Sequence, residues 1–294
     1  MDGIFNINKP TAMTSHDVVA IIRKHLKQKH VGHAGTLDPL ASGVLPICVG
    51  QATRVAEYLS ESGKAYQADI NFGTATDTYD AEGTITATAS TADLTLNMIQ
   101  ETLEQFRGPQ MQYPPRYSAI KIQGQPAYKR ARAGEAIVLE PRPIVIYSLE
   151  IRDWIPPRLT LAIECSKGTY IRSLAHDLGM QLGCYAYLET LVRTRSGPFT
   201  LSDSITLEQL ADAVETNSIQ HYSFPLDKAL EQYPAFKIDA ETVERIKHGN
   251  TFNNSVANNF GLARVYDTNG AFIAIAEWNE KQLAWQPKKV FASD

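Results

Sequence analysis

The 294-residue chain lacks the features that mark membrane, secreted or disulfide-bonded proteins. Charge or glycine interrupts its most apolar windows within about ten residues, whereas a membrane-spanning helix needs roughly 20 apolar residues. The first ten residues, MDGIFNINKP, lack the basic and apolar regions of a secretory signal. Only three cysteines occur, and none has the CxxC spacing of a zinc or redox site. We therefore expect buried, reduced thiols in a cytoplasmic protein.

Motifs for nucleotides and metals are also missing. The chain has no P-loop, no GxGxxG after a strand and no HExxH. The segment Thr76–Gly83, TDTYDAEG, carries closely spaced carboxylates, but it is too short for an EF-hand loop and lacks the closing glutamate. We interpret it as a solvated turn, and we expect no metal and no cofactor in this protein.

Acidic residues are absent from two long segments. The net charge of −4 argues against a general nucleic-acid binder. However, Val18–Leu37 and Gln105–Gly134 contain lysine, arginine and histidine but no acid, and the second segment also contains tyrosines. The acidic residues gather instead in Asp203–Glu244. Basic stretches with interleaved aromatic residues favour an RNA-facing surface, although a merely solvated charged face accounts for the same pattern.

Apolar periodicity predicts both strands and helices. Tyr66, Ala68, Ile70 and Phe72 alternate with polar residues, which predicts a half-buried strand over residues 66–73. Apolar runs predict further strands over residues 3–8, 45–49, 144–151 and 159–165. Helical spacing predicts a helix capped by Thr14 or Ser15, one capped by Thr169, and others over residues 96–107, 207–214 and 240–248. We therefore expect an α/β (α+β) fold.

Two features divide the chain. Residues 109–135 have no periodic apolar pattern and are basic and proline-rich, which predicts a long exposed insertion. Tyr233-Pro234 closes the acidic stretch, and after it Asn269-Gly270 joins two alternating segments, a strong hairpin signal. We expect a catalytic domain over residues 1–232 and a small, mostly β domain over residues 233–294.

The loop Gly32–Gly43, GHAGTLDPLASG, presents a single carboxylate, Asp38. Pro39 fixes its own φ and pushes Asp38 towards an extended or turn conformation. A carboxylate on a stiff loop before a core strand suits a reactive acid. From the Asp-Pro pair alone, an aspartate that only caps its own turn is the favoured interpretation.

The longer string Gly32–Arg54, GHAGTLDPLASGVLPICVGQATR, resembles the signature of the bacterial tRNA pseudouridine synthase B family. The resemblance covers most of residues 4–200. It continues in order through NINKPTAMTSHDVV, KAYQADINFGTATDTYDAEG, YPPRYSAIKIQGQPAYKRARAGE, CSKGTYIRSLAHDLG and LVRTRSGPF.

This resemblance implies a fold and a reaction. The fold would be the pseudouridine-synthase core, with a mixed, largely antiparallel sheet, an RNA-contacting insertion at about residues 109–135 and a C-terminal domain that is PUA-like by position. The reaction would convert the T-loop uridine at position 55 of tRNA to pseudouridine. The family needs no cofactor, no metal and no obligate protein partner, and it binds the tRNA T stem-loop.

The resemblance also assigns catalytic roles to individual residues. Asp38 would be the nucleophile, reached by flipping the target base out of the RNA. Arg172 would pair with Asp38 and keep the carboxylate ionised, whereas by pattern alone it is a solvated cation. Tyr66 would stack on the base and handle a proton, whereas by pattern alone it is a core tyrosine.

Further residues would hold the RNA. His33 would enter the RNA loop that the target base leaves, although alone it would be an ordinary loop histidine. Tyr170 would bind substrate and Leu191 would line the base pocket, where a core leucine is the simpler interpretation. The remaining RNA contacts implied by the resemblance are Lys129, Arg130 and Arg132.

Two other functions fit the same residues. One is a tRNA-binding folding chaperone whose isomerase activity is incidental. The other is a synthase that depends on a guide RNA, against which the tRNA-directed insertion Tyr113–Glu135 argues.

The basic insertion leads to a first prediction. Replacing Lys129, Arg130 and Arg132 together by alanine should weaken binding to all tRNAs, because phosphate contacts are independent of sequence. For every phosphate that the variant no longer binds, the slope of log affinity against log salt should fall by about one. The measurement is a filter-binding salt titration. A triple variant with the wild-type slope would show that this segment does not touch RNA.

Overall fold

The protein is described by a computed structural model that covers residues 1–118, 120–122, 124–127, 130, 135, 139–253 and 261–291. Lys129 and Arg132 lie outside the described residues. The three cysteines are buried and unpaired, as expected. Within the described part of the chain no helix is long and apolar enough to cross a membrane.

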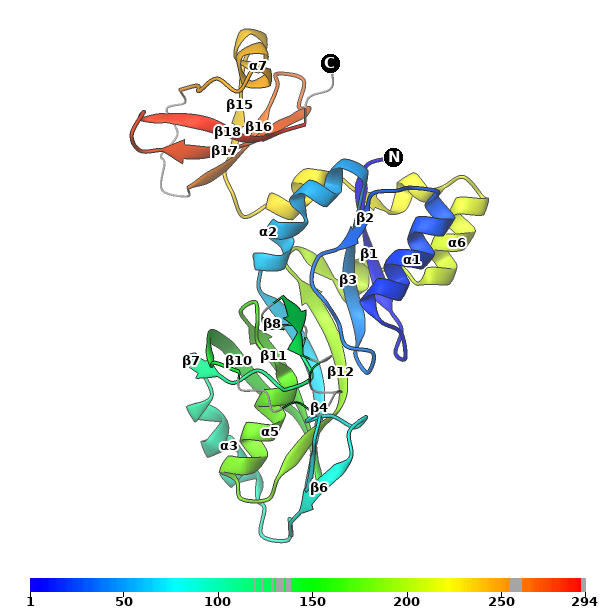
Figure 1. Ribbon diagram of the computed structural model, residues 1–294, viewed down its shortest axis with the longest axis vertical. Coiled ribbons are helices and arrows are strands. Elements are labelled where there is room, and N and C mark those ends of the chain that lie inside the picture. Colours follow the sequence, from blue (N-terminus) through cyan, green and yellow to red (C-terminus); the bar gives the residue numbers. More distant parts are fainter. Residues whose placement is uncertain are drawn as a thin grey trace.

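A ten-stranded sheet forms the larger part of the molecule (Figure 1). All its paired strands run antiparallel except β12 beside β3, so the predicted mixed, largely antiparallel sheet is confirmed. The path β14-β1-β3-β12-β4-β11-β10-β7 is extended by β13 on β12 and β2 on β3. These strands are β1 (Gly3–Lys9), β2 (Val31–His33), β3 (Ser42–Val49), β4 (Lys64–Phe72), β7 (Gly108–Gln112), β10 (Arg142–Ile155), β11 (Arg158–Cys165), β12 (Ala186–Ser196), β13 (Phe199–Thr200) and β14 (Ser223–Phe224).

Helices pack on this sheet through the apolar residues that predicted them. Val18 and Ile22 of α1, Leu210 of α6 and Leu174 of α5 are buried in the same core cluster as the sheet residues. The cluster includes Ile70 of β4, so the alternation of that strand has the predicted buried face. The helices are α1 (Ser15–Leu26), α2 (Ala56–Glu61), α3 (Leu96–Gln105), α5 (Ile171–Gln181) and α6 (Leu207–Glu215), with the 3-10 helix η1 (Gly50–Val55) before α2.

The helix caps show one correct and one wrong prediction. Thr14 caps α1 in a reciprocal capping box with Asp17, as its sequence suggested. Thr169 does not cap α5, because its hydroxyl donates to the Ser166 carbonyl oxygen at 3.0 Å. The N-cap is Tyr170, without a side-chain cap, and the Gln112 side chain accepts from the Tyr170 N–H at 2.8 Å. α5 therefore begins without a side-chain cap, and a remote amide binds the N–H of its N-cap residue.

The predicted insertion begins later than expected. Residues 109–112 are not an exposed loop, because β7 pairs with β10 at the edge of the sheet. Gly108, at φ 88°, turns the chain out of α3 directly into this strand. Two short pairs complete the strands of this region: β5 (Thr74–Thr76) with β6 (Ile85–Thr88), and β8 (Lys121–Ile122) with β9 (Gln125–Pro126).

A small β-rich unit follows at one end of the molecule (Figure 1), and its expected hairpin at Asn269-Gly270 is present between β16 and β17. Its own core includes Phe236, Ile246 and Trp285. Arg54 of η1 donates to the Val290 carbonyl oxygen at 2.8 Å and links this unit to the larger sheet. The elements are β15 (Ala235–Lys237), α7 (Ala240–Lys247), β16 (Leu262–Tyr266), β17 (Phe272–Asn279) and β18 (Ala284–Val290).

The parallel contact of β3 with β12 places the loop that carries Asp38, and Gly43 makes this contact possible. Gly43 has φ +98°, and a Cβ there would lie 2.3 Å from the Arg193 carbonyl oxygen. Gly270 has a similar φ of +89° but open space around it. Gly270→Ala should therefore lower the free energy of unfolding by only about 1 kcal/mol, from φ strain.

Gly43→Ala adds a backbone clash to the same strain and should lower the free energy of unfolding by more than about 3 kcal/mol. Chemical denaturation of both variants measures the difference. Equal losses for Gly43→Ala and Gly270→Ala would contradict the close approach of β3 to β12.

Candidate active site

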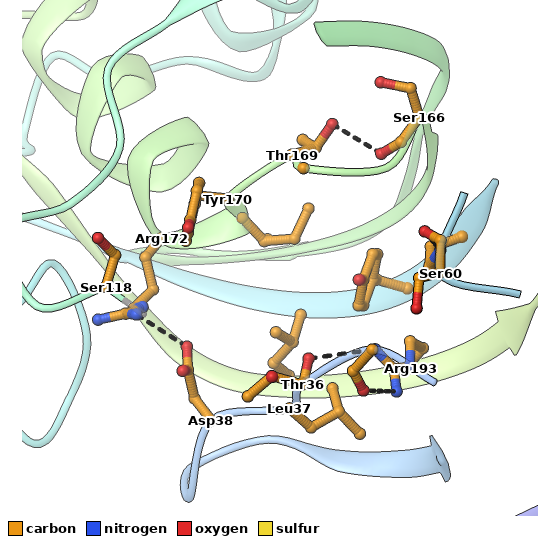
Figure 2. A pocket seen from close by; sticks show the side chains of 16 residues that line it. Thr36, Leu37, Asp38, Ser60, Ser118, Ser166, Thr169, Tyr170, Arg172 and Arg193 are labelled. Atoms are coloured by element: carbon orange, nitrogen blue, oxygen red, sulfur yellow. Dashed lines mark hydrogen bonds and ion pairs between the residues drawn. The ribbon is translucent and has the colours of Figure 1, made fainter. Parts of the chain in front are cut away.

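A cavity of about 260 Å³ opens between the Asp38 loop and the beginning of α5 (Figure 2). Its floor comes from the sheet, through Tyr66 on β4 and Leu191 on β12. Of the sequence-predicted site residues, the structure brings five to this cavity: Asp38, Tyr66, Tyr170, Arg172 and Leu191. They come from four separate segments of the chain, which makes a shared binding site the simplest reason for their convergence.

Arg172 is the centre of the polar wall. Its side chain is only 6% exposed, and one terminal nitrogen, Nη2, lies 2.9 Å from Oδ2 of Asp38. The Asp38 side chain is 41% exposed, so this carboxylate faces the cavity while Arg172 holds it in place. Figure 2 shows the pair at one end of the cavity. A charge-assisted contact of this length orients the carboxylate.

A second carboxylate, Asp80, meets the same guanidinium. Asp80 Oδ2 lies 3.4 Å from Arg172 Nη1, and its side chain is 5% exposed. Its other oxygen accepts from the Thr78 hydroxyl at 2.5 Å and from the Glu82 N–H at 3.1 Å. The prediction of a solvated turn over Thr76–Gly83 is therefore wrong at Asp80.

Sequence reasoning missed Asp80 because its partner stands far away in the chain, on α5. The available signal was that Asp80 lies inside a segment resembling the family motifs. Its turn is fixed to β12, since the Leu188 N–H donates to the Tyr79 carbonyl oxygen at 3.0 Å and the Ala81 N–H donates to that of Leu188 at 3.0 Å. These hydrogen bonds fix the turn that carries Asp80 to the strand that carries Leu191.

The two terminal nitrogens of Arg172 also donate to the backbone, whereas its Nε is buried without a partner among the described residues. Nη2 donates to the Tyr117 carbonyl oxygen at 2.9 Å and Nη1 donates to that of Thr78 at 3.3 Å. One cation therefore serves two carboxylates and two carbonyl groups. A further cation lies nearby, because the Asp38 charge acts on Lys9. Burial outweighs that charge and lowers the pKa of Lys9 to about 8.

Arg193 is a second buried arginine, and sequence reasoning missed it as well. It is 1% exposed and donates to the carbonyl oxygens of Val44 at 2.7 Å, Gly35 at 3.1 Å and Thr36 at 3.3 Å. Its guanidinium also interacts with the Tyr66 side chain. The one available signal was its place in the segment LVRTRSGPF. Arg193 thereby joins the Asp38 loop to the tyrosine on the cavity floor.

Two tyrosines present protonated hydroxyl groups to the cavity. Burial is the main cause that raises the pKa of Tyr66 above its usual value, although the neighbouring Arg193 charge opposes it. Burial also raises the pKa of Tyr170. At neutral pH both groups therefore keep the proton and can donate a hydrogen bond to a ligand.

Two predicted site residues described by the structure do not line the cavity. His33 lies on β2, and burial, the largest cause, lowers its pKa below the usual value, so the ring is neutral at pH 7. Its Nδ1 is buried without a partner among the described residues. Arg130 pairs with Glu135 at 2.6 Å. Among the residues the structure describes, no group of three or more His, Cys, Asp or Glu could hold a metal ion.

Comparisons with known proteins cover nearly the whole chain. Residues 23–171 match the family model of the TruB family pseudouridylate synthase (N terminal domain). Residues 172–231 match the tRNA pseudouridylate synthase B C-terminal domain, and residues 234–290 match pseudouridine synthase II TruB, C-terminal. The tRNA pseudouridine synthase B of Dehalococcoides mccartyi is 43% identical over 291 residues, 99% of this chain and 97% of that protein. That of Symbiobacterium thermophilum is 46% identical over 252 residues, 85% and 82% of the two chains.

Solved structures resemble the fold over the same length. A chain in the crystal structure of a Cbf5-Nop10-Gar1 complex superposes with a TM-score of 0.78 and 28% identity, covering 99% of this chain and 85% of that chain. A chain of an H/ACA RNP bound to a substrate RNA containing 2′-deoxyuridine gives a TM-score of 0.77 and 26% identity, with the same coverage.

The shared guanidinium predicts a stability effect. Arg172→Ala leaves the buried Asp80 carboxylate without its cation, so the free energy of unfolding should fall by about 3–5 kcal/mol. Adding Asp80→Asn to this variant should restore part of the loss, because the uncompensated charge is gone.

Arg195→Ala is the matched control. Arg195 pairs with Glu164 at 3.2 Å, but the two side chains are 34% and 52% exposed. Its removal should change the free energy of unfolding by less than about 1 kcal/mol. Chemical denaturation measures all three variants, and an Arg172→Ala loss as small as that of Arg195→Ala would contradict the buried pairing.

Proposed function

This chain belongs to the TruB family of pseudouridylate synthases, and on that premise we propose that it isomerises the uridine at position 55, in the T loop of tRNA, to pseudouridine. Relatives that cover almost its full length carry the name tRNA pseudouridine synthase B. The observation that carries the proposal is the placement of Asp38. Its carboxylate faces the cavity and is paired with the buried Arg172.

The reaction needs few protein groups. The N1–C1′ bond of the uridine breaks, the uracil turns within the site, and a C5–C1′ bond forms, with one proton lost from C5 and one gained at N1. No outside reactant enters. The Asp38 carboxylate attacks C1′ as the N1–C1′ bond breaks, so that the uracil detaches without leaving a free cation. C5 then displaces the carboxylate from C1′ as the new bond forms. Arg172 orients Asp38, and Asp80 holds Arg172 from the buried side.

The size and lining of the cavity favour a single extruded nucleoside. At about 260 Å³ it has no room for a base still stacked between its neighbours. Tyr66 and Leu191 offer an aromatic and an apolar surface for the uracil, and the protonated Tyr66 hydroxyl donates to it. The neutral imidazole of His33, on the strand that leads into the Asp38 loop, fills the space that the base leaves in the RNA loop.

The rest of the chain binds the remainder of the tRNA in this proposal. Residues 1–232 form the catalytic domain, with the insertion at about residues 109–135 contacting RNA through Lys129, Arg130 and Arg132. Residues 233–294 form a PUA-like RNA-binding domain. The enzyme acts in the cytoplasm and needs no obligate protein partner. Support comes from the acid-free basic segments and from the three consecutive family matches.

Asp38→Asn tests the proposal. It keeps the size and turn-forming ability of the side chain but removes the negative charge, so isomerisation should be abolished. Affinity for tRNA should stay within about tenfold, because phosphate contacts and stacking are untouched. The measurement is pseudouridine mapping of an unmodified tRNA transcript under single-turnover conditions, with pure protein and no guide RNA.

The outcomes separate the functions. A chaperone in which Asp38 only caps a turn predicts an Asp38→Asn protein that still makes pseudouridine. A guide-dependent synthase predicts no product from the wild type under these conditions. Wild-type rates from Asp38→Asn would remove this residue from the mechanism.

A further inference from the structure

Ser118 has a buried hydroxyl group in the cavity wall that the protein itself does not use. The residue is 3% exposed and lines the cavity, and its Oγ has no hydrogen-bond partner among the described residues. Figure 2 shows it near Arg172 and Tyr170, at the Asp38 end of the cavity. Nine-tenths or more of buried polar groups have a partner, and an unmet one costs about 1–3 kcal/mol.

The other serines of the cavity are satisfied by the fold. Ser60 donates to the Ala56 carbonyl oxygen at 3.0 Å. Ser166 accepts from the Val145 N–H at 2.9 Å and donates to the Lys167 carbonyl oxygen at 3.3 Å. Both hydroxyl groups therefore have a structural role, and Ser118 is the exception among the serines that line this cavity.

Ser118 is also held in place. The preceding carbonyl, that of Tyr117, accepts from Arg172, and the Ser173 hydroxyl donates to the Tyr113 carbonyl oxygen at 2.7 Å. Gln112, at the start of the same segment, makes two hydrogen bonds with the backbone of Tyr170, at 3.0 and 2.8 Å. Residues 112–118 are thus fixed against the beginning of α5, and a group presented from this segment has a defined position.

The surroundings of Ser118 indicate the chemistry of its ligand. Two carboxylates, Asp38 and Asp80, face the single Arg172 guanidinium, so this end of the cavity is unsuited to a phosphate. Burial raises the pKa of the Tyr170 hydroxyl and an interaction with Ser118 opposes this rise, so the two hydroxyl groups lie beside each other. A hydroxyl that both donates and accepts, beside another hydroxyl, suits a neutral oxygen.

We propose that the Ser118 hydroxyl hydrogen-bonds an oxygen that flanks the glycosidic bond of the flipped uridine, either uracil O2 or the ribose 2′-hydroxyl. This inference rests on the proposed function, in which Asp38 must reach C1′. Each oxygen is carried by a carbon directly bonded to N1 or to C1′. A hydrogen bond to either oxygen positions the glycosidic bond relative to Asp38 before N1–C1′ breaks, and one to the 2′-hydroxyl also holds C1′ while the base turns.

The test compares Ser118→Ala with Ser196→Ala. Ser196 is 0% exposed, its Oγ is likewise without a partner among the described residues, and it is not part of the cavity lining. Removing an unmet buried hydroxyl should leave either variant as stable as the wild type or more stable. Only Ser118→Ala should lose single-turnover rate, by about 3- to 10-fold. Equal rates for Ser118→Ala and wild type would overturn the proposal.

Modified substrates identify the oxygen. T stem-loop RNAs carry uridine, 2-thiouridine or 2′-deoxyuridine at the target position. If Ser118 contacts uracil O2, 2-thiouridine should slow the wild type but should not slow Ser118→Ala any further. If Ser118 contacts the 2′-hydroxyl, 2′-deoxyuridine should slow the wild type but should not slow Ser118→Ala any further. Fully multiplicative losses with both RNAs would overturn the proposal. A wild type inactive on the uridine RNA would instead show that the proposed function has failed.

Discussion

The guanidinium of Arg172 is the group on which the geometry of the site depends. A buried cation without partners would cost several kcal/mol, so the chain must bring compensating groups to it. It does so from three directions: Asp38 from the loop before β3, Asp80 from the turn after β5, and the Tyr117 carbonyl from the segment after β7. These three segments come from separate parts of the chain. Their meeting at one arginine fixes the position of the cavity-facing carboxylate.

Arg193 gives a second attachment for the same loop. It donates to the carbonyl oxygens of Gly35 and Thr36, so the loop is fixed from β12 as well as from α5. Two buried arginines thus hold the loop and its carboxylate before any substrate is bound, which is the preorganisation that the proposed function requires. The unmet Ser118 hydroxyl fits the same picture, because functional sites keep polar groups whose partner is the ligand.

Local pattern predicted the parts of the fold that depend on local pattern. The alternation Tyr66–Phe72 gave β4, and the spacing of Val18 and Ile22 gave α1, because one buried face imposes a period on the sequence. The edge strand β7 was missed because its partner β10 lies far along the chain and its sequence is rich in glutamine and proline. Thr169 was a reasonable cap by propensity, but its hydroxyl donates to the Ser166 carbonyl oxygen instead.

The site shows the same division. The resemblance to known motifs brought Asp38, Arg172, Tyr66, Tyr170 and Leu191 to attention, and the structure places them around one cavity. Asp80 and Arg193 were missed because a buried ion pair or a backbone clamp is a relation between distant residues. A turn whose carboxylates face solvent and a turn whose carboxylate pairs with a buried arginine can have the same sequence. Only the folded chain distinguishes them.

A double-mutant cycle tests most directly whether Asp80 acts through Arg172. Single-turnover rates would be measured for Asp80→Asn, for Arg172→Lys and for the double variant, at a temperature where all are folded. If both residues act through one guanidinium, the double variant should be about as slow as the slower single variant, because the second change removes nothing further. Losses that multiply in the double variant would show that the two residues act independently and would contradict the central role given to this arginine.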